Sequence, residues 1–239
     1  MTKQSIYNVL RTIRYIVYSI YFNFHYLPFK QAIRLPILLY KPHLHQLKGS
    51  IVIDTNKIST GMVKLGYPSS YLYPNNGIMY ENGGGTIVIH GRMAIGNASA
   101  ISIGPKGKLE LFPYVGATAS LKLVCYHRIV IGTNTLIGWD CIVMDTDLHS
   151  CTIVNDNHQK KRMTKGYDPV LIGEDVWIGN GALILKGSII NNKCIVASRT
   201  VYTKTSTTFP EYCLIAGTPP RVIKEGIFHN RFDDIINYQ

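Results

Sequence analysis

One histidine of this chain has two carboxylates close to it in the sequence. The segment Met144-Asp-Thr-Asp-Leu-His149 places Asp145 and Asp147 just before His149. Imidazole titrates near neutral pH and can take a proton from a hydroxyl group as the oxygen attacks a carbonyl carbon. A carboxylate on the other ring nitrogen would fix the tautomer and stabilise the imidazolium, and either aspartate is near enough in sequence to do so. The same residues also fit a histidine in a solvent-exposed loop.

This segment interrupts a repeat with a period of six residues. Each hexad has an isoleucine or valine, often followed by glycine or alanine, with a mostly compact side chain four places after it. An amphipathic strand alternates every second residue and a helix returns after three or four, so neither explains the spacing. The aliphatic positions are Ile131, Ile137, Val143, Ile172, Ile178, Ile184, Ile190 and Val196, and the small ones include Gly132, Gly138, Gly173, Gly179 and Ala197.

A strand that turns a corner every six residues predicts a triangular coil of three hexads, in which each residue stacks on the one eighteen places later. Successive coils then lie about 4.8 Å apart. We expect Ile172 to stack on Ile190, pointing inward, with small residues relieving crowding at the corners. Ile178 would stack on Val196 in the same way. The sequence therefore predicts an all-β solenoid.

The repeat is irregular before residue 104, which predicts irregular opening coils. It breaks after Val143 and resumes at Val170. An excursion of this size from a solenoid is usually an external functional loop, here predicted near residues 147–169. His149 lies at the start of that loop.

The first part of the chain has a different pattern, with aliphatic and aromatic residues at helical spacing. We expect a helical region over residues 1–50, punctuated by prolines, and a β-helix domain over residues 51–239 that ends in a short C-terminal cap. The apolar run Tyr15–Phe24 is shorter than the roughly 20 residues that a spanning helix needs, and no cleavage pattern follows it. This favours a soluble or membrane-surface protein, whose tyrosines either pack on the main domain or lie at a lipid interface.

The composition, 46% hydrophobic and 16% charged over 239 residues, is that of a globular chain with a core. Five cysteines form no CxxC pair and leave one over from any set of disulfides, which indicates a reducing compartment. The net charge of +11 predicts an attraction for anions. The basic residues are scattered and no nucleic-acid-binding motif is present, so we expect no nucleic acid partner.

The hexads resemble those of the hexapeptide-repeat acyltransferases. Val176-Trp-Ile-Gly-Asn-Gly-Ala-Leu-Ile-Leu-Lys-Gly-Ser188 is close to the consensus of that family, and Ile215-Ala-Gly-Thr-Pro-Pro-Arg-Val-Ile-Lys224 is similar to its usual terminal cap. The resemblance covers roughly residues 85 to 225, and the N-terminal part looks like that of bacterial polysaccharide O-acetyltransferases. It implies a left-handed parallel β-helix, assembled as a homotrimer with active sites between neighbouring subunits.

The resemblance also implies the roles of individual residues. His149 matches the family's essential histidine, with Asp147 or Asp145 as its partner. Trp139 and Asp140 could contact a sugar, or equally pack in the subunit interface. For acetyl-CoA the matching positions are Trp177, Gly179, Ala197, Ser198, Lys204 and Arg221, with Lys204 and Arg221 near the phosphates.

The implied activity is acetyl transfer from acetyl-CoA, as co-substrate, to a hydroxyl of a sugar in a cell-surface polysaccharide or its precursor. The enzyme would be cytoplasmic. Peripheral contact of its N-terminal region with the inner face of the membrane is an open alternative. Two alternatives remain, an N-acetyltransferase of a nucleotide-linked amino sugar and a non-catalytic trimeric scaffold. No metal is expected, because the zinc enzymes of this fold use two histidines four residues apart and no histidine pair here has that spacing.

Overall fold

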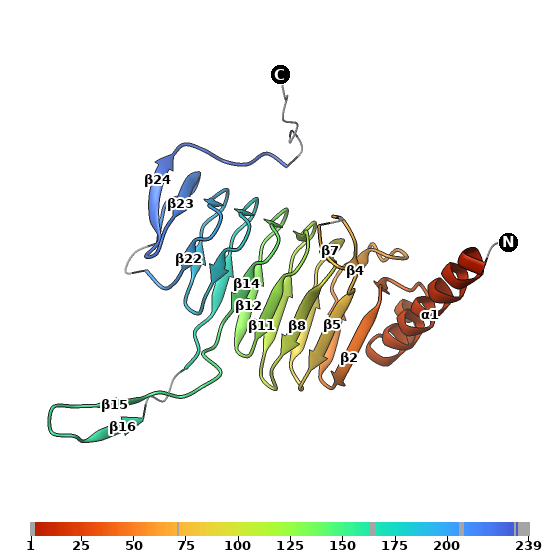
Figure 1. Cartoon of the computed structure of the whole chain (residues 1–239), viewed down its shortest axis with the longest axis horizontal. Helices are drawn as coiled ribbons and strands as arrows, with labels where there is room; N and C mark the ends of the chain where they lie inside the picture. Colours follow the sequence, from red (N-terminus) through yellow and green to blue (C-terminus); the bar gives the residue numbers. More distant parts are fainter. Residues whose placement is uncertain (1–2, 71, 163–165, 206–207, 232, 234–239) are drawn as a thin grey trace.

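The computed structural model describes residues 3–70, 72–162, 166–205, 208–231 and 233. From residue 37 onward the chain winds into a stack of coils, seen in Figure 1 as a row of strands between an N-terminal helix and a C-terminal hairpin. Apart from two hairpins, consecutive strands of the described residues belong to different sheets, and they pair in parallel with strands of the neighbouring coils. This confirms the predicted solenoid.

Three sheets form the sides of the coil, and their edges meet at three corners. The first contains β1 (Ile37–Leu39), β4 (Val63–Tyr67), β7 (Met93–Gly96), β10 (Gly116–Ala117), β13 (Leu136–Ile137), β18 (Trp177–Ile178), β21 (Ile195–Val196), β23 (Cys213–Ala216) and β24 (Arg221–Glu225). The second contains β2 (Pro42–Leu47), β5 (Ile78–Asn82), β8 (Ser99–Ile103), β11 (Lys122–Cys125), β14 (Ile142–Met144), β19 (Leu183–Ile184) and β22 (Val201–Tyr202). The third contains β3 (Ser50–Ile53), β6 (Thr86–Ile89), β9 (Lys108–Leu111), β12 (Arg128–Ile131), β17 (Val170–Ile172) and β20 (Ile189–Ile190).

The register of the strands is the one that the hexads predict. Ile172 pairs with Ile190, and Ile178 pairs with Val196, and all four side chains are buried. The apolar core is the column of these stacked aliphatic residues inside the coil. The core therefore follows directly from the repeat.

The corners of the coil need two kinds of residue. A Cβ on Gly173 would lie 2.8 Å from the backbone nitrogen of Asn192 in the next coil, so the small residue is required by the stacking of coils. Two positions later the backbone enters the left-handed region, and this recurs every six residues at Asp175, Gly181, Gly187, Lys193 and Arg199. Lysine and arginine are unusual in this conformation, which costs residues with a Cβ roughly 1–2 kcal/mol.

The helical region is shorter than expected. Its helices are α1 (Lys3–Tyr26) and α2 (Phe29–Ala32), and residues 37–47 of the region expected to be helical contain β1 and β2 of the first coil. Pro36 and Pro42 cannot continue a helix, and Ile37 and Leu39 point into the coil. The predicted boundary at residue 50 thus falls inside the first coil.

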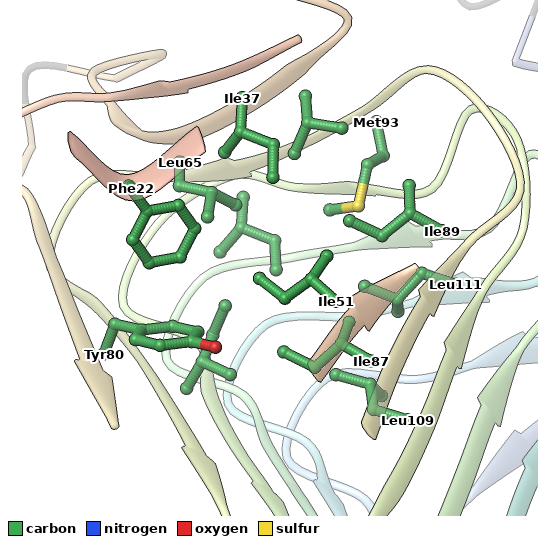
Figure 2. Close-up of a pocket in the computed structure, with 13 residues that line it drawn as sticks. Phe22, Ile37, Ile51, Leu65, Tyr80, Ile87, Ile89, Met93, Leu109 and Leu111 are labelled. Carbon is green, nitrogen blue, oxygen red and sulfur yellow. The ribbon is translucent and has the colours of Figure 1, made fainter. Parts of the chain in front are cut away.

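Helix α1 closes the N-terminal end of the coil (Figure 1). The Asn23 side chain donates to the Ile37 carbonyl oxygen at 2.7 Å and accepts from the Ile37 N–H at 3.1 Å, while the Ser19 hydroxyl accepts from the Leu39 N–H. These bonds satisfy the free edge of β1. Below the helix, Phe22 and Tyr80 point into an apolar cavity of about 20 Å³ at the end of the core (Figure 2).

At the other end, β23 and β24 pair antiparallel and form the predicted C-terminal cap. The predicted external loop is also present. Its hairpin, β15 (Thr152–Val154) and β16 (Lys160–Arg162), projects away from the coil between β14 and β17 (Figure 1). The solenoid therefore places one long excursion at the corner between its second and third sheets.

Candidate functional site

His149 is exposed at the start of this loop, five residues after the end of β14. Two contacts fix the base of the loop on the coil. Thr146 forms a β-bridge with Tyr167, and the Asp147 N–H donates to the Gly166 carbonyl oxygen at 2.7 Å. The two ends of the excursion are thus held together beside His149, while the hairpin beyond them extends into solvent.

Asp147 is the carboxylate on the exposed side of this base. Its Oδ2 lies 2.5 Å from Nζ of Lys186, which follows β19 in the next coil. A Cβ on Gly166 would lie 3.2 Å from the His149 carbonyl oxygen and 3.8 Å from Asp147 Oδ2. The His149 backbone and the Asp147 carboxylate therefore pack against the same glycine, which has room for both because it lacks a side chain.

Asp145 has a different environment. It is fully buried, and its two carboxylate oxygens accept the backbone N–H groups of Tyr126 and His127, each at 2.8 Å. Burial, and next the negative charge of Asp145, raise the pKa of the neighbouring Cys125 thiol. Both oxygens of Asp145 thus hold the turn between β11 and β12, which leaves Asp147 as the accessible carboxylate of the pair.

Lys204 lies on the same corner, one coil beyond Lys186. The two lysines are eighteen residues apart and the strands that precede them, β19 and β22, pair in register. Lys204 Nζ contacts Asp168 Oδ2 at 2.9 Å, at the end of the loop. Lys204 was predicted from the sequence, whereas Lys186 and Asp168 were not, although the eighteen-residue spacing of the two lysines is a signal for Lys186.

Trp139 and Asp140 lie on another corner, after β13. Asp140 Oδ2 accepts the hydroxyl of Tyr73 at 2.6 Å, and the Trp139 carbonyl oxygen accepts the Gly181 N–H. Desolvation and this carboxylate raise the pKa of Tyr73 to about 12. Tyr73 was not predicted from the sequence, because it lies far from Asp140 in the chain and in an irregular stretch that the hexads do not cover.

The predicted acetyl-CoA residues fall into separate groups within one chain. Gly179 packs directly on Ala197 and Ser198 of the next coil, where an added Cβ would lie 2.6 Å from the Ser198 nitrogen. The exposed Trp177 side chain contacts the His229 ring, with centroids 5.0 Å apart. Arg221 is exposed on β24 of the same sheet as Trp177, whereas Lys204 belongs to the loop corner. The structure thus packs three of these residues, Gly179, Ala197 and Ser198, against one another and places Lys204 on a different corner.

Four of the five cysteines are buried and all are free thiols. Burial raises the pKa of the Cys141 thiol to about 11, and burial together with Cys194 raises that of Cys213 to about 12. Such thiols are poor nucleophiles near neutral pH. Within the described residues, no group of three or more His, Cys, Asp or Glu side chains could hold a metal ion.

No protein-family model matches the chain. An uncharacterized 24.8 kDa protein from the cps region of Klebsiella pneumoniae is 34% identical over 154 residues, 64% of this chain and 64% of that protein. The putative lipopolysaccharide biosynthesis O-acetyltransferase WbbJ of Escherichia coli K12 is 31% identical over 109 residues, 44% of this chain and 54% of that protein. Galactoside O-acetyltransferase of the same organism is 28% identical over 46% of this chain and 50% of its own length. The chain thus spans about half to two thirds of these relatives.

The crystal structure of the polysialic-acid-specific acetyltransferase NeuO aligns with 81% of this chain and 74% of its own, at 16% identity and a TM-score of 0.47. This likeness is too distant to support an argument about function. The sequence relatives, the six-residue repeat and the three-sheet parallel coil agree with one another. Over part of its length the chain is thus similar to proteins named as acetyltransferases, and its six-residue repeat folds into a three-sheet parallel coil.

Proposed function

We propose that this protein is an acetyl-CoA-dependent O-acetyltransferase that acetylates a sugar hydroxyl in a cell-surface polysaccharide or its precursor. The observation that carries the proposal is the exposed His149 at the point where a regular coil is interrupted, in a chain whose relatives include proteins named as O-acetyltransferases. Five free cysteines fit a cytoplasmic location, where thiols stay reduced.

In the proposed reaction, His149 takes the proton of the acceptor hydroxyl as its oxygen attacks the thioester carbonyl carbon of acetyl-CoA. The tetrahedral intermediate then collapses, the carbon–sulfur bond breaks, and the imidazolium returns the proton to the departing CoA thiolate. The acetyl group ends as an ester on the sugar. No covalent enzyme intermediate is needed, which agrees with the raised pKa values of the buried cysteines.

Asp147 is the carboxylate that we assign to orient and stabilise the His149 imidazolium. Its place beside the same glycine as His149 supports this role, and Lys186 would hold the carboxylate in position. Asp145 accepts hydrogen bonds from two backbone N–H groups, and we assign it a structural role at the base of the loop.

For the donor, we propose that pantetheine lies along the stacked corner of Gly179, Ala197 and Ser198, with Trp177 nearby. Lys204 and Arg221 would provide cations for the phosphates. Because the loop and the stacked corner belong to different corners of one chain, we propose a homotrimer in which the loop of one subunit meets the donor residues of its neighbour. Trp139 and Asp140 would contact the acceptor sugar there.

The test is incubation of the protein with acetyl-CoA and a panel of mono- and oligosaccharides, including nucleotide-linked amino sugars, followed by mass spectrometry of the acceptors. We expect the mass gain of one acetyl group, removed by mild alkali because esters hydrolyse and amides do not. An alkali-stable product on an amino sugar would establish the N-acetyltransferase alternative instead. No product with any acceptor and no acetyl-CoA binding by calorimetry would establish the scaffold.

A further inference from the structure

One side of helix α1 is covered by the coil, and the opposite side is apolar and exposed. Ser19, Phe22 and Asn23 face the coil and are buried. The opposite side carries large apolar side chains that are between 40 and 58% exposed, at a spacing that places them on one helix face. They are Ile16, Val17, Ile20, Tyr21 and Phe24. A helix whose outer side faced only water would carry polar residues there.

The exposed apolar face continues onto α2. The Phe24 and Phe29 rings lie with their centroids 5.9 Å apart, and Phe29 and Ile33 are 68 and 60% exposed. We call these seven residues, the five of α1 together with Phe29 and Ile33, the outer cap face. Lys30 and Arg34 are exposed directly beside it. A contiguous apolar patch with a polar rim marks an interaction surface.

The segment of the sequence that contains the outer cap face has charges of one sign. The first 53 residues contain no Asp or Glu, whereas the remainder of the chain contains all 14. The same 53 residues carry seven of the 25 basic side chains and thus most of the net charge of +11. The seven are Lys3, Arg11, Arg14, Lys30, Arg34, Lys41 and Lys48.

We propose that the outer cap face docks on the surface of an anionic membrane. Helices that lie in the interface combine an apolar face, aromatic residues and flanking cations, as this cap does. No described helix is long and apolar enough to span a bilayer. A second copy that docked through the same face is a poorer occupant, because this isologous contact would bring the basic rim against itself.

Docking by the outer cap face would fix the distance between the membrane and the loop that carries His149. The strands β2, β5, β8, β11 and β14 are consecutive in the second sheet. The loop after β14 therefore lies about four strand spacings, roughly 19 Å, beyond the first coil along the solenoid. An acceptor anchored in the same membrane would have to extend over that distance to meet His149.

The proposal is tested by sedimentation of the whole protein with vesicles of phosphatidylcholine alone or mixed with phosphatidylglycerol, at low and high salt. A double variant, Ile20→Ser with Phe24→Ser, removes apolar surface without touching the core. The matched control is Ile153→Ser with Val154→Ser, two apolar residues of the loop hairpin that are somewhat more exposed than Ile20 and Phe24. Lys30→Gln with Lys48→Gln tests the charge.

We expect wild type and control to bind the mixed vesicles at least about tenfold more strongly than neutral ones, and high salt to weaken the binding. The cap variant should lose binding about tenfold, the lysine variant less, and both should keep acetyl transfer to soluble acceptors. Equal binding of cap variant and control, or no binding to mixed vesicles, would overturn the proposal. The proposal would also be overturned if the protein self-associated without binding vesicles and the cap variant abolished that self-association.

Discussion

Replacement of Asp145 by Asn tests whether this aspartate has a structural role that differs from the proposed role of Asp147. The carboxylate is fully buried and accepts two backbone N–H groups at 2.8 Å. The amide has nearly the same shape but only one acceptor oxygen, so one backbone N–H would face another donor. Loss of such a charge-assisted bond costs about 1.5–3 kcal/mol of the free energy of unfolding. For a chain of this size that lowers the melting temperature by roughly 3–12 °C.

The matched variant is Asp147→Asn, which removes the charge of a residue that is 40% exposed and paired with Lys186. A pair that accessible contributes about 0–1 kcal/mol, so the melting temperature should change little. Circular dichroism melts of both variants give the comparison, with acetyl transfer measured below both transitions. We expect Asp147→Asn to lower kcat and Asp145→Asn to leave kcat unchanged per folded molecule. The assignment fails if the two variants melt together, or if Asp145→Asn lowers kcat more than Asp147→Asn.

Three further predictions concern other contacts and the cysteines. In kinetic and melting assays, Gly179→Ala should raise the KM for acetyl-CoA and cost about 1–3 kcal/mol of stability, because its Cβ meets the backbone of the next coil. The control Gly83→Ala should do neither, because the nearest atom to its Cβ would lie 3.4 Å away. Asn23→Leu should cost about 2–4 kcal/mol in urea unfolding, because it strands the N–H and carbonyl of Ile37; an unchanged midpoint would contradict the capping role. In Ellman titration of the native protein, Cys151 should react fast and the buried thiols only after denaturation.

Much of the fold follows from the hexads. Stacking of Ile172 on Ile190 is a direct consequence of three strands closing one coil, because only that period keeps aliphatic residues inward. The left-handed corners at Lys193 and Arg199 were not predictable from residue preference, since these residue types rarely adopt that conformation. The first coil was missed because its irregular strands have no hexads and follow helical sequence directly.

The candidate site was less predictable than the fold. The break in the repeat located His149, but the sequence could not distinguish Asp145 from Asp147, because residues two apart share one face of a strand and the repeat stops before both. Only the structure shows that one is buried against backbone amides and the other exposed. The partners Tyr73 and His229 depend on contacts between distant parts of the chain, which no local pattern encodes.

The central claim is that His149 is the base of acetyl transfer. The most direct measurement compares CoA release from acetyl-CoA, with a sugar that wild type acetylates, by His149→Ala and by His158→Ala at matched melting temperature. His158 is the control because it is an exposed histidine in the same loop. Both variants should carry Cys151→Ser if thiol reagents detect the CoA. We predict a loss of about 10²–10⁴-fold in kcat for His149→Ala and none for His158→Ala. Undiminished turnover in folded His149→Ala would contradict the account.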